Sequence, residues 1–353
     1  MSDLTFFSKE YRNINRRKYI FIGIFSLISI SFIIITLGFG VYDISIVDAV
    51  KVFIDHISGD IVDKKGNIYV WDMRLPRGIA AVFIGAGLAI GGAVMQNVMN
   101  NPLAEPYTIG VSSGAFLGAT LSMILGFSIV PFLNGNYATI ANAFVFSLIP
   151  VAMILALSKF KKLSSTAIIL LGIAVMYIFS SITQFLMVTT TSEKLAEVYN
   201  WKVGSLAKVT WDNLPYIVVI VAVLSIVLML LYKKLDVMYS GDRTAQTLGV
   251  NPSRIRILSL TLVSLMTAGI VSFTGTIGFI GLVGPHIARI FVGSNNKYLI
   301  PASAAFGASF LIIADTIAKV SGINGLPVGV ISSMVGGPLF LYILIKQRKK
   351  VWS

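Results

Sequence analysis

Few side chains in the apolar part of this sequence could titrate, bind a metal or attack a substrate. His286, Arg289, Asp315 and Lys319 are the main candidates. Asp315 and Lys319 lie one helical turn apart and could pair, which is how charges inside a membrane are usually stabilised. His286 follows Pro285, whose missing N–H leaves a carbonyl free, so a hydrogen-bonded structural histidine is favoured over a proton relay. Four scattered groups do not form the convergent constellation that an enzyme needs.

Known catalytic motifs are absent as well. The sequence contains no His-Glu-x-x-His pair, no Gly-x-Ser-x-Gly elbow and no cysteine, and its two histidines, His56 and His286, are far apart. It has no Gly-Lys dipeptide and hence no phosphate-binding loop for ATP. We therefore expect a chain that is not an enzyme and binds neither metal nor cofactor. If ATP powers it, ATP and Mg²⁺ must bind another polypeptide.

The elements that carry these residues are apolar and long. Hydrophobic residues make up 56% of the 353 positions and charged residues only 12%, about half the charge of a soluble domain. Long charge-free runs recur, and about 20 apolar residues suffice to cross a membrane. After division at Pro131, Gly135, Gly275 and Gly278 the runs predict an all-α polytopic membrane protein with ten transmembrane helices. The predicted spans are 19–39, 78–98, 107–130, 136–158, 163–188, 213–232, 255–274, 276–293, 299–318 and 327–345.

The basic residues predict the orientation. Alternating segments between the spans carry 19 of the 28 Lys and Arg residues on one side of the membrane and nine on the other, and the richer side is normally cytoplasmic. We expect a cytoplasmic segment 1–18, a ten-span domain 19–345 and a cytoplasmic tail 346–353, in the cell membrane. Because the charges lie in scattered short loops, no nucleic-acid partner is expected. The first run is long and lacks a cleavage site, so we interpret it as a retained span.

Two loops have helical patterns. Outside, Ile46, Val50, Phe53 and Ile57 recur at helical spacing behind a capping box of Ser45 and Asp48. That helix fits either the membrane surface or ordinary packing. Inside, the loop 233–256 is the largest surface available to a partner. It fits two short helices broken at Gly249, Asn251 and Pro252.

Several motifs resemble a known family. They stand in unbroken order over residues 70–345 as Arg74-Leu-Pro-Arg77, Gly85-Ala-Gly-Leu-Ala-Ile-Gly-Gly-Ala-Val-Met-Gln96, Asn101-Pro-Leu-Ala-Glu-Pro106, Gly110-Val-Ser-Ser-Gly-Ala115, Gly275-Thr-Ile-Gly-Phe-Ile-Gly-Leu-Val-Gly-Pro-His286, Leu326-Pro-Val-Gly329 and Gly336-Gly-Pro338. The chain resembles the permease subunits of ATP-binding-cassette (ABC) importers for iron-siderophore, haem and cobalamin, the FecCD-type or type II importers. The resemblance implies the fold of the vitamin B12 importer permease. It also implies a second permease subunit, identical or paralogous, two cytoplasmic ABC ATPases, an external substrate-binding protein and a metal-chelate substrate.

The same resemblance assigns roles to residues. The loop 233–256 matches the ATPase-coupling loop, with Asp242 in place of the more usual Glu in a Gly-Glu-x-x-Ala-x-x-Leu-Gly pattern. The matching positions are Gly241, Asp242, Ala245, Leu248 and Gly249. The residues that match the docking site for the binding protein are Arg74, Arg77 and Lys319, and those that match a cytoplasmic gate are Ser164, Ser165 and Thr166.

Residue chemistry alone leaves alternatives for each of these roles. Arg74 and Arg77 could extend to lipid headgroups, the Ser164 cluster could be an ordinary N-cap, and the loop 233–256 could be a solvated connector. A secondary transporter or channel driven by an ion gradient is the rival function, and it should show coupling carboxylates near the membrane midplane. The sequence places none there. An iron siderophore is the first expectation for the cargo, with haem and cobalamin as alternatives.

Overall fold

The computed structural model describes residues 2–160, 164–322 and 325–347, and this part of the chain is helical without strands. The first half contains α1 (Ser2–Ile35), η1 (Thr36–Gly38), α2 (Ile46–Ser58), α3 (Lys64–Asn67), η2 (Ile68–Arg74), α4 (Leu75–Val98), η3 (Pro106–Ile109), α5 (Val111–Leu125), α6 (Gly135–Phe160) and α7 (Ser165–Val188). The second half contains α8 (Ser192–Lys202), α9 (Leu214–Leu230), α10 (Tyr232–Tyr239), α11 (Asp242–Thr247), α12 (Pro252–Thr274), α13 (Ile280–Val292), α14 (Asn296–Val320) and α15 (Val328–Gln347).

The helices confirm a polytopic membrane protein, although they do not establish ten crossings. Among the described residues, seven helices are long and apolar enough to cross a membrane, and an eighth candidate is α9 with α10, bent by 59°. The two other apolar helices, α5 and α13, are shorter, with 15 and 13 residues. Each of the ten predicted spans coincides with one apolar helix, and the count of ten stays a prediction.

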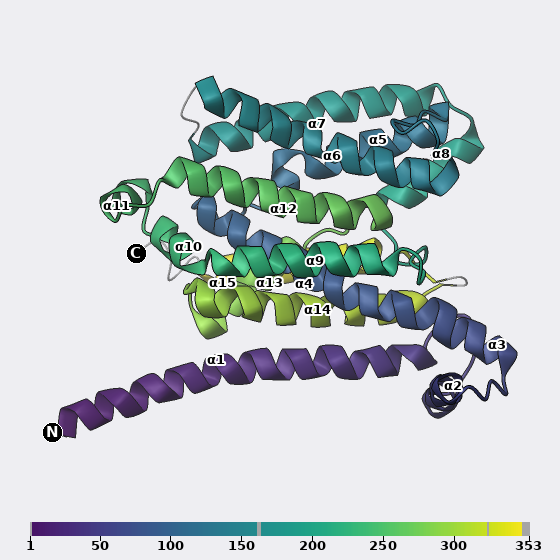
Figure 1. Ribbon diagram of the computed structural model, residues 1–353, viewed down its shortest axis with the longest axis horizontal. Coiled ribbons are helices and arrows are strands. Elements are labelled where there is room, and N and C mark those ends of the chain that lie inside the picture. The colour runs from purple at the N-terminus through teal and green to yellow at the C-terminus, as the bar shows by residue number, and fades with distance from the viewer. Residues whose placement is uncertain (1, 161–163, 323–324, 348–353) are drawn as a thin grey trace.

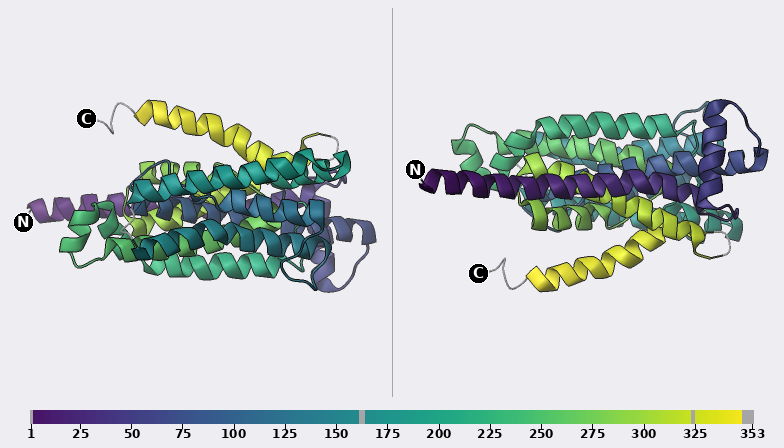
Figure 2. Two further views of the ribbon diagram at one scale, coloured as in Figure 1. Left: turned by 90° about the horizontal axis from the view of Figure 1, so that it is seen from above. Right: turned by 90° about the horizontal axis from the view of Figure 1, so that it is seen from below.

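The long helices run roughly along one axis, so the bundle has two ends (Figure 1). The beginning of α1, the end of α15 and the segment α10–α11 lie at one end, and α2, α3 and α8 lie at the other (Figures 1 and 2). We call these the inner end and the outer end, following the charge distribution in the sequence. The helix α2 lies across the bundle axis (Figure 2), with the capping box of Ser45 and Asp48 formed as predicted.

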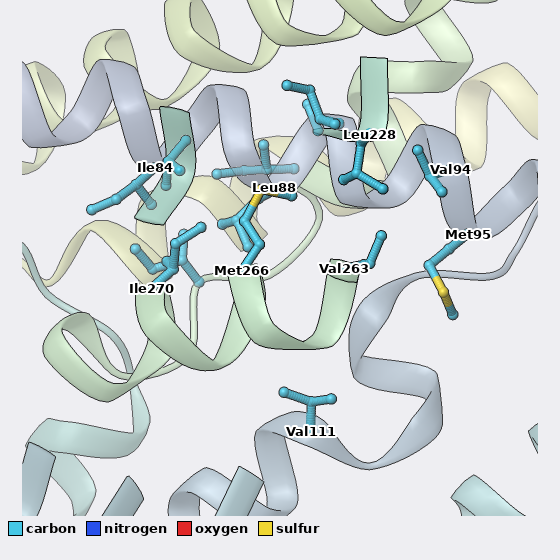
Figure 3. Packing of buried hydrophobic residues seen from close by; sticks show 14 of the residues in the cluster. Ile84, Leu88, Val94, Met95, Val111, Leu228, Val263, Met266 and Ile270 are labelled. Carbon is cyan, nitrogen blue, oxygen red and sulfur yellow. The ribbon is translucent and has the colours of Figure 1, made fainter. Parts of the chain in front are cut away.

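The helix α4 is the centre of the bundle. Its apolar side chains, including Ile84 and Leu88, meet Met266 and Ile270 of α12 in a continuous core (Figure 3). On another side it touches α14 backbone to backbone, because a Cβ atom on Gly85 or Gly307 would overlap the carbonyl oxygen of the other residue. Small residues allow helices to approach this closely in membranes, where packing rather than hydrophobicity holds them together. The pair α4–α14 therefore forms a rigid axis for the molecule.

The predicted spans 107–130 and 276–293 begin too early. Residues 105–110 and 275–279 are not α-helical, and Pro106 contacts Gly91, seven residues before the end of α4. Both segments thus enter the bundle, where free backbone groups need partners. Tyr107 provides one, since its hydroxyl donates to the carbonyl of Ile277 over 3.1 Å. Hydropathy reports only that these segments are apolar, and it cannot distinguish a membrane-spanning α-helix from a buried segment without α-helical structure.

Candidate functional site

A cavity lies between α5, α7, α8 and α15. This cavity has a volume of about 940 Å³. Its lining residues are Tyr107, Ser112, Ser113, Phe116, Met176, Ser180, Thr183, Gln184, Met187, Tyr199, Lys202, Val203, Thr276, Gly278, Gly329, Val330 and Ser333. It extends from α8, at the outer end, to the beginning of α5 inside the bundle, so it follows the direction in which a cargo would move.

The cavity wall is mostly uncharged. Hydroxyl, amide and thioether groups alternate with aromatic rings, and the lining contains one cation and no carboxylate. The cation is Lys202, whose Nζ atom lies 5.3 Å from the ring centre of Phe116. No group of three or more His, Asp or Glu residues that could hold a metal ion occurs in the described part of the chain. Weak, scattered hydrogen-bonding groups suit passage of a large polar molecule better than its chemical conversion.

The helix α7 connects this cavity to the inner end. It begins beside Ser164, whose hydroxyl caps the helix by accepting from the backbone N–H of Ala167 over 3.2 Å. Ser180 lies 16 residues further along, or about 24 Å at 1.5 Å per residue. Ser164 and Thr166 are exposed and Ser165 is half-buried. The capping role of Ser164 is thus visible, whereas the predicted gate is not tested by this arrangement.

The predicted coupling loop folds into the short helices α10 and α11 at the inner end. Ala245 is fully buried, while Leu248 is 63% exposed and projects from the surface. Gly241 and Gly249 flank α11 with φ angles of 96° and 76°, values that side chains with a Cβ atom rarely tolerate. The sequence predicted two short helices here, and the structure contains them.

The position of the break was predicted wrongly. The chain turns between the two short helices at Ser240 and Gly241, whereas Gly249 ends α11 and Asn251 caps the long helix α12. Pro252 occupies the first turn of α12, where its missing N–H costs nothing. Gly249 and Pro252 were predicted to form a break between two short helices, although the same residues serve equally well as the end of one helix and the start of a membrane span.

Two polar junctions tie this segment to the bundle, and neither was predicted from the sequence. Arg256 donates to an Asp242 carboxylate oxygen over 2.7 Å and to the carbonyl of Val98 over 2.9 Å. Asp236 accepts from the backbone and side-chain N–H groups of Asn296, each over 2.7 Å. Sequence spacing gives no signal for these contacts, because the partners are separated by up to 158 residues.

At the outer end, three charged residues form a buried network. Arg77 of α4 binds Asp315 of α14 through two nitrogens, the closest pair being 2.7 Å apart, and Lys319 reaches the other oxygen of Asp315 over 3.3 Å. The expected pair of Asp315 and Lys319 is present. Arg77 joins it as a second cation that the sequence did not connect to it.

The arginines and the lysine are less available than the docking prediction implies. Arg74 is 5% exposed and donates to the carbonyls of Leu37 and Tyr42, while Lys319 is 6% exposed and donates to the hydroxyl of Thr36. Only Arg77, with 16% of its side chain exposed, reaches the surface. These contacts hold α1, α4 and α14 together at the outer end, and docking of a partner there stays a prediction.

Inside the bundle, Gln96 links α4 to Arg289 and Leu282 of α13. Arg289 donates to Gln96 over 3.1 Å, and Gln96 donates to the carbonyl of Leu282. The predicted hydrogen bond of His286 is not found at Nδ1, which is buried without a partner. Its ring packs edge-on against Phe340 instead, with the ring centres 5.4 Å apart.

Comparison with known proteins gives one family. Residues 27–346 match the model of the FecCD transport family. An ABC transporter permease protein of Methanocaldococcus jannaschii is 38% identical, with 97% of this chain and 99% of that protein aligned. A cobalamin import system permease protein of Halobacterium salinarum is 37% identical over 80% of this chain and 75% of its own length.

A solved structure agrees with the fold. It is described as an inward-facing conformation of a metal-chelate type ABC transporter, and it superposes with a TM-score of 0.80 at 29% identity. The superposition covers 92% of this chain and 98% of the other. The helical arrangement described above is therefore that of an ABC transporter permease.

Proposed function

The chain belongs to the FecCD transport family and is a permease subunit of an ABC importer, and from this premise we propose that it forms one half of a pore whose wall is the cavity between α5, α7 and α15. The observation that carries the proposal is that cavity, which is lined by Tyr199 and Lys202 of α8 at the outer end and by residues of α7 from Met176 to Met187. The second half is another copy of this chain or a paralogue. A membrane-spanning transport component of this kind has no catalytic site of its own.

The energy comes from two cytoplasmic ATPase subunits that bind ATP and Mg²⁺. Their contact surface is α10 and α11, with the exposed Leu248 and the backbone turns at Gly241 and Gly249. A partly apolar, helical projection at the inner end is suited to a groove in a partner and to rigid-body motion. The inner end, with both termini, then lies in the cytoplasm.

At the outer end the partner is a binding protein that delivers the cargo. Arg77 is the residue by which we propose that it docks, because Arg74 and Lys319 are buried. Replacement of Arg77 by Gln leaves the pair of Asp315 and Lys319 in place. The affinity of the binding protein for this variant in nanodiscs should fall about fivefold, as expected for one partly exposed ion pair. An unchanged affinity would move docking to another part of the outer surface.

Cargo passes through the cavity and then between the inner ends of the α7 helices of the two permease subunits, where Ser164, Ser165 and Thr166 form the gate. The wall offers hydroxyl and thioether groups without a carboxylate, which suits an iron chelate whose own oxygens already hold the metal. The relatives differ in cargo, since one is named for cobalamin and another for a metal chelate. We propose an iron(III)-siderophore as cargo, with haem and cobalamin as the other members of the class.

Uptake by the reconstituted complex tests the function. Proteoliposomes that contain this chain, its ATPase and its binding protein should accumulate a radiolabelled iron chelate only when ATP is inside. A matched chain in which Ser180 is replaced by Trp, filling the cavity from α7, should bind the ATPase but lose uptake. Equal uptake by the Trp variant would show that the cargo takes another route.

A further inference from the structure

We propose that Arg256 is the residue that passes movement of the ATPase-facing helix α11 to the membrane helices. The proposal rests on the proposed function, since it assumes that α11 contacts the ATPase. It adds a positioning role to a residue outside the Gly-x-x-x-x-x-x-x-Gly pattern of the coupling loop. The position of its guanidinium group gives the reason.

The Arg256 side chain joins three elements. It arises from the first turns of α12 and is 2% exposed. One of its nitrogens donates to Asp242 at the first position of α11, and another donates to the carbonyl of Val98, the last residue of α4. The carbonyls at the end of a helix have no partner within that helix. Arg256 therefore provides a hydrogen-bond donor for the last carbonyl of α4 and at the same time binds the first residue of α11.

The geometry explains why an arginine fits this position. A guanidinium group offers several N–H donors in a fixed planar fork, so it can hold two acceptors in a defined relative position, whereas an ammonium group cannot. Hydrogen bonds to a charged donor are about twice as strong as those between neutral groups. The Asp242 end of the ion pair is 46% exposed and the Arg256 end only 3%. The pair thus reaches from the surface that meets the ATPase into the buried base of α4.

The two helices held by Arg256 contact the cavity wall. α4 packs at Gly91 against Pro106, whose neighbour Tyr107 lines the cavity. α12 packs against α5, where Val271 meets Ala115 and Ala119. A displacement of α11 by the ATPase would therefore be transmitted at one buried point to both α4 and α12. The other connections of α11 are the buried, uncharged Ala245 and the turn from Leu248 to Asn251.

The test uses variants from both ends of the ion pair. Arg256→Gln and Asp242→Asn each remove it, and Arg254→Gln is the matched control, an exposed arginine two residues away on the same helix. In complete complexes with Arg256→Gln or Arg254→Gln, ATP hydrolysis without the binding protein should stay at the wild-type rate. In Arg256→Gln and Asp242→Asn, the stimulation of hydrolysis by the purified binding protein should fall about tenfold, the factor that one charge-assisted hydrogen bond is worth. Asp242→Asn changes an exposed residue, so it remains informative if Arg256→Gln folds poorly.

Two further readouts distinguish a coupling role of Arg256 from a merely structural role. The double variant should be no worse than Arg256→Gln alone, because that change already removes the ion pair with Asp242. Arg256→Lys, which keeps the charge but not the fork, should recover only part of the stimulation. If Arg256 only supported folding, basal hydrolysis and assembly would fall together with stimulation, and Asp242→Asn would have no effect. Wild-type stimulation in Arg256→Gln would also overturn the proposal.

A distance measurement tests the junction without any transport partner. Spin labels on cysteines at Gln246 and Leu103, both exposed and on opposite sides of the junction, can be introduced into this cysteine-free chain. Their distance distribution should be narrow in the wild type and in Arg254→Gln, and broad in Arg256→Gln. A narrow distribution in Arg256→Gln would refute the junction. If the wild-type complex showed no stimulation by the binding protein while the distances behaved as expected, the proposed function would fail and the junction would stand.

Discussion

At the scale of single residues, the charges of this protein hold helices together. Arg77, Asp315 and Lys319 connect α4 with α14 at the outer end, and Arg256 connects α4 with α11 and α12 at the inner end. A charge buried in a membrane protein is costly unless it is paired. Each of these side chains reaches a partner from another element. The buried charges therefore mark the contacts on which the relative positions of the helices depend.

Asp315 is the shared partner of two cations, so its replacement should be severe. Asp315→Asn leaves Arg77 and the buried Lys319 without a counter-charge, and breaking a buried pair from one side costs about 3–5 kcal/mol. We expect a clearly lower melting temperature of the purified chain, followed by the fluorescence of its tryptophans. The control is Asp48→Asn, which removes an exposed pair with Lys51. Equal melting temperatures for both variants would mean that the outer network contributes nothing to stability.

The sequence showed which charged residues matter, but it predicted only some of the contacts that they make. The pair of Asp315 and Lys319 follows from helical spacing and is confirmed. The contact of Arg77 with Asp315 spans 238 residues, and the burial of Arg74 depends on how the chain after α1 folds over it. Neither can be inferred from local spacing. For this reason the sequence predicts a surface of three basic residues, whereas two of them are buried structural contacts.

At the scale of elements, residues with positive φ set where the two short apolar helices begin. α5 begins after Gly110 and α13 after Phe279, both with positive φ, so neither reaches the length that hydropathy predicted. The long helices were predicted to within a few residues, except that α1 begins at Ser2 and not at residue 19, because a charge-free run of about 20 residues has one stable conformation in a membrane. The rule does not apply to the segments before α5 and α13, which contribute Tyr107, Thr276 and Gly278 to the cavity wall.

Close packing of α4 on α14 gives a prediction for Gly307. A methyl group at this position would overlap the carbonyl of Gly85 and the Cβ atom of Ala89, and overpacking costs about 1–3 kcal/mol. Gly307→Ala should therefore lower the melting temperature and weaken uptake. Gly23→Ala is the control, since no atom lies within 4 Å of the place that its methyl group would occupy and alanine favours helix. A stable Gly307→Ala variant would show that the two helices can separate without cost.

The turn after α11 gives a second prediction at this scale. Gly249 has a φ of 76° and open space around it. The side chain added in Gly249→Val would therefore strain the backbone, although it would not clash with another residue. The strained turn should misdirect α11 and uncouple hydrolysis from uptake while the complex still assembles. Gly126→Val is a close control, because Gly126 also has positive φ and open surroundings but lies at the outer end of α5. If both variants, or neither, lost coupling, α11 would not be the site of energy transfer.

At the scale of the whole molecule, charge and contact geometry agree on two distinct ends. The inner end carries α10 and α11, and the outer end carries α2, α3 and α8 (Figures 1 and 2). Tyr199 and Lys202 of α8 line the cavity. The sequence predicted this division from the positions of Lys and Arg alone, since lysine and arginine are retained on the cytoplasmic side. The ends follow from the fold, and their assignment to the two sides of the membrane is a prediction.

Cysteine labelling in intact cells decides that assignment, because the chain has no cysteine of its own. Val62 at the outer end is 83% exposed, and Gln246 on α11 is exposed at the inner end. A membrane-impermeant thiol reagent should label Val62→Cys in intact cells and should reach Gln246→Cys only after the membrane is opened. Both positions lie on the surface, so a difference between them reports the side of the membrane rather than burial. The opposite labelling pattern would invert the protein, place α10–α11 outside the cell, and separate the coupling segment from any cytoplasmic ATPase.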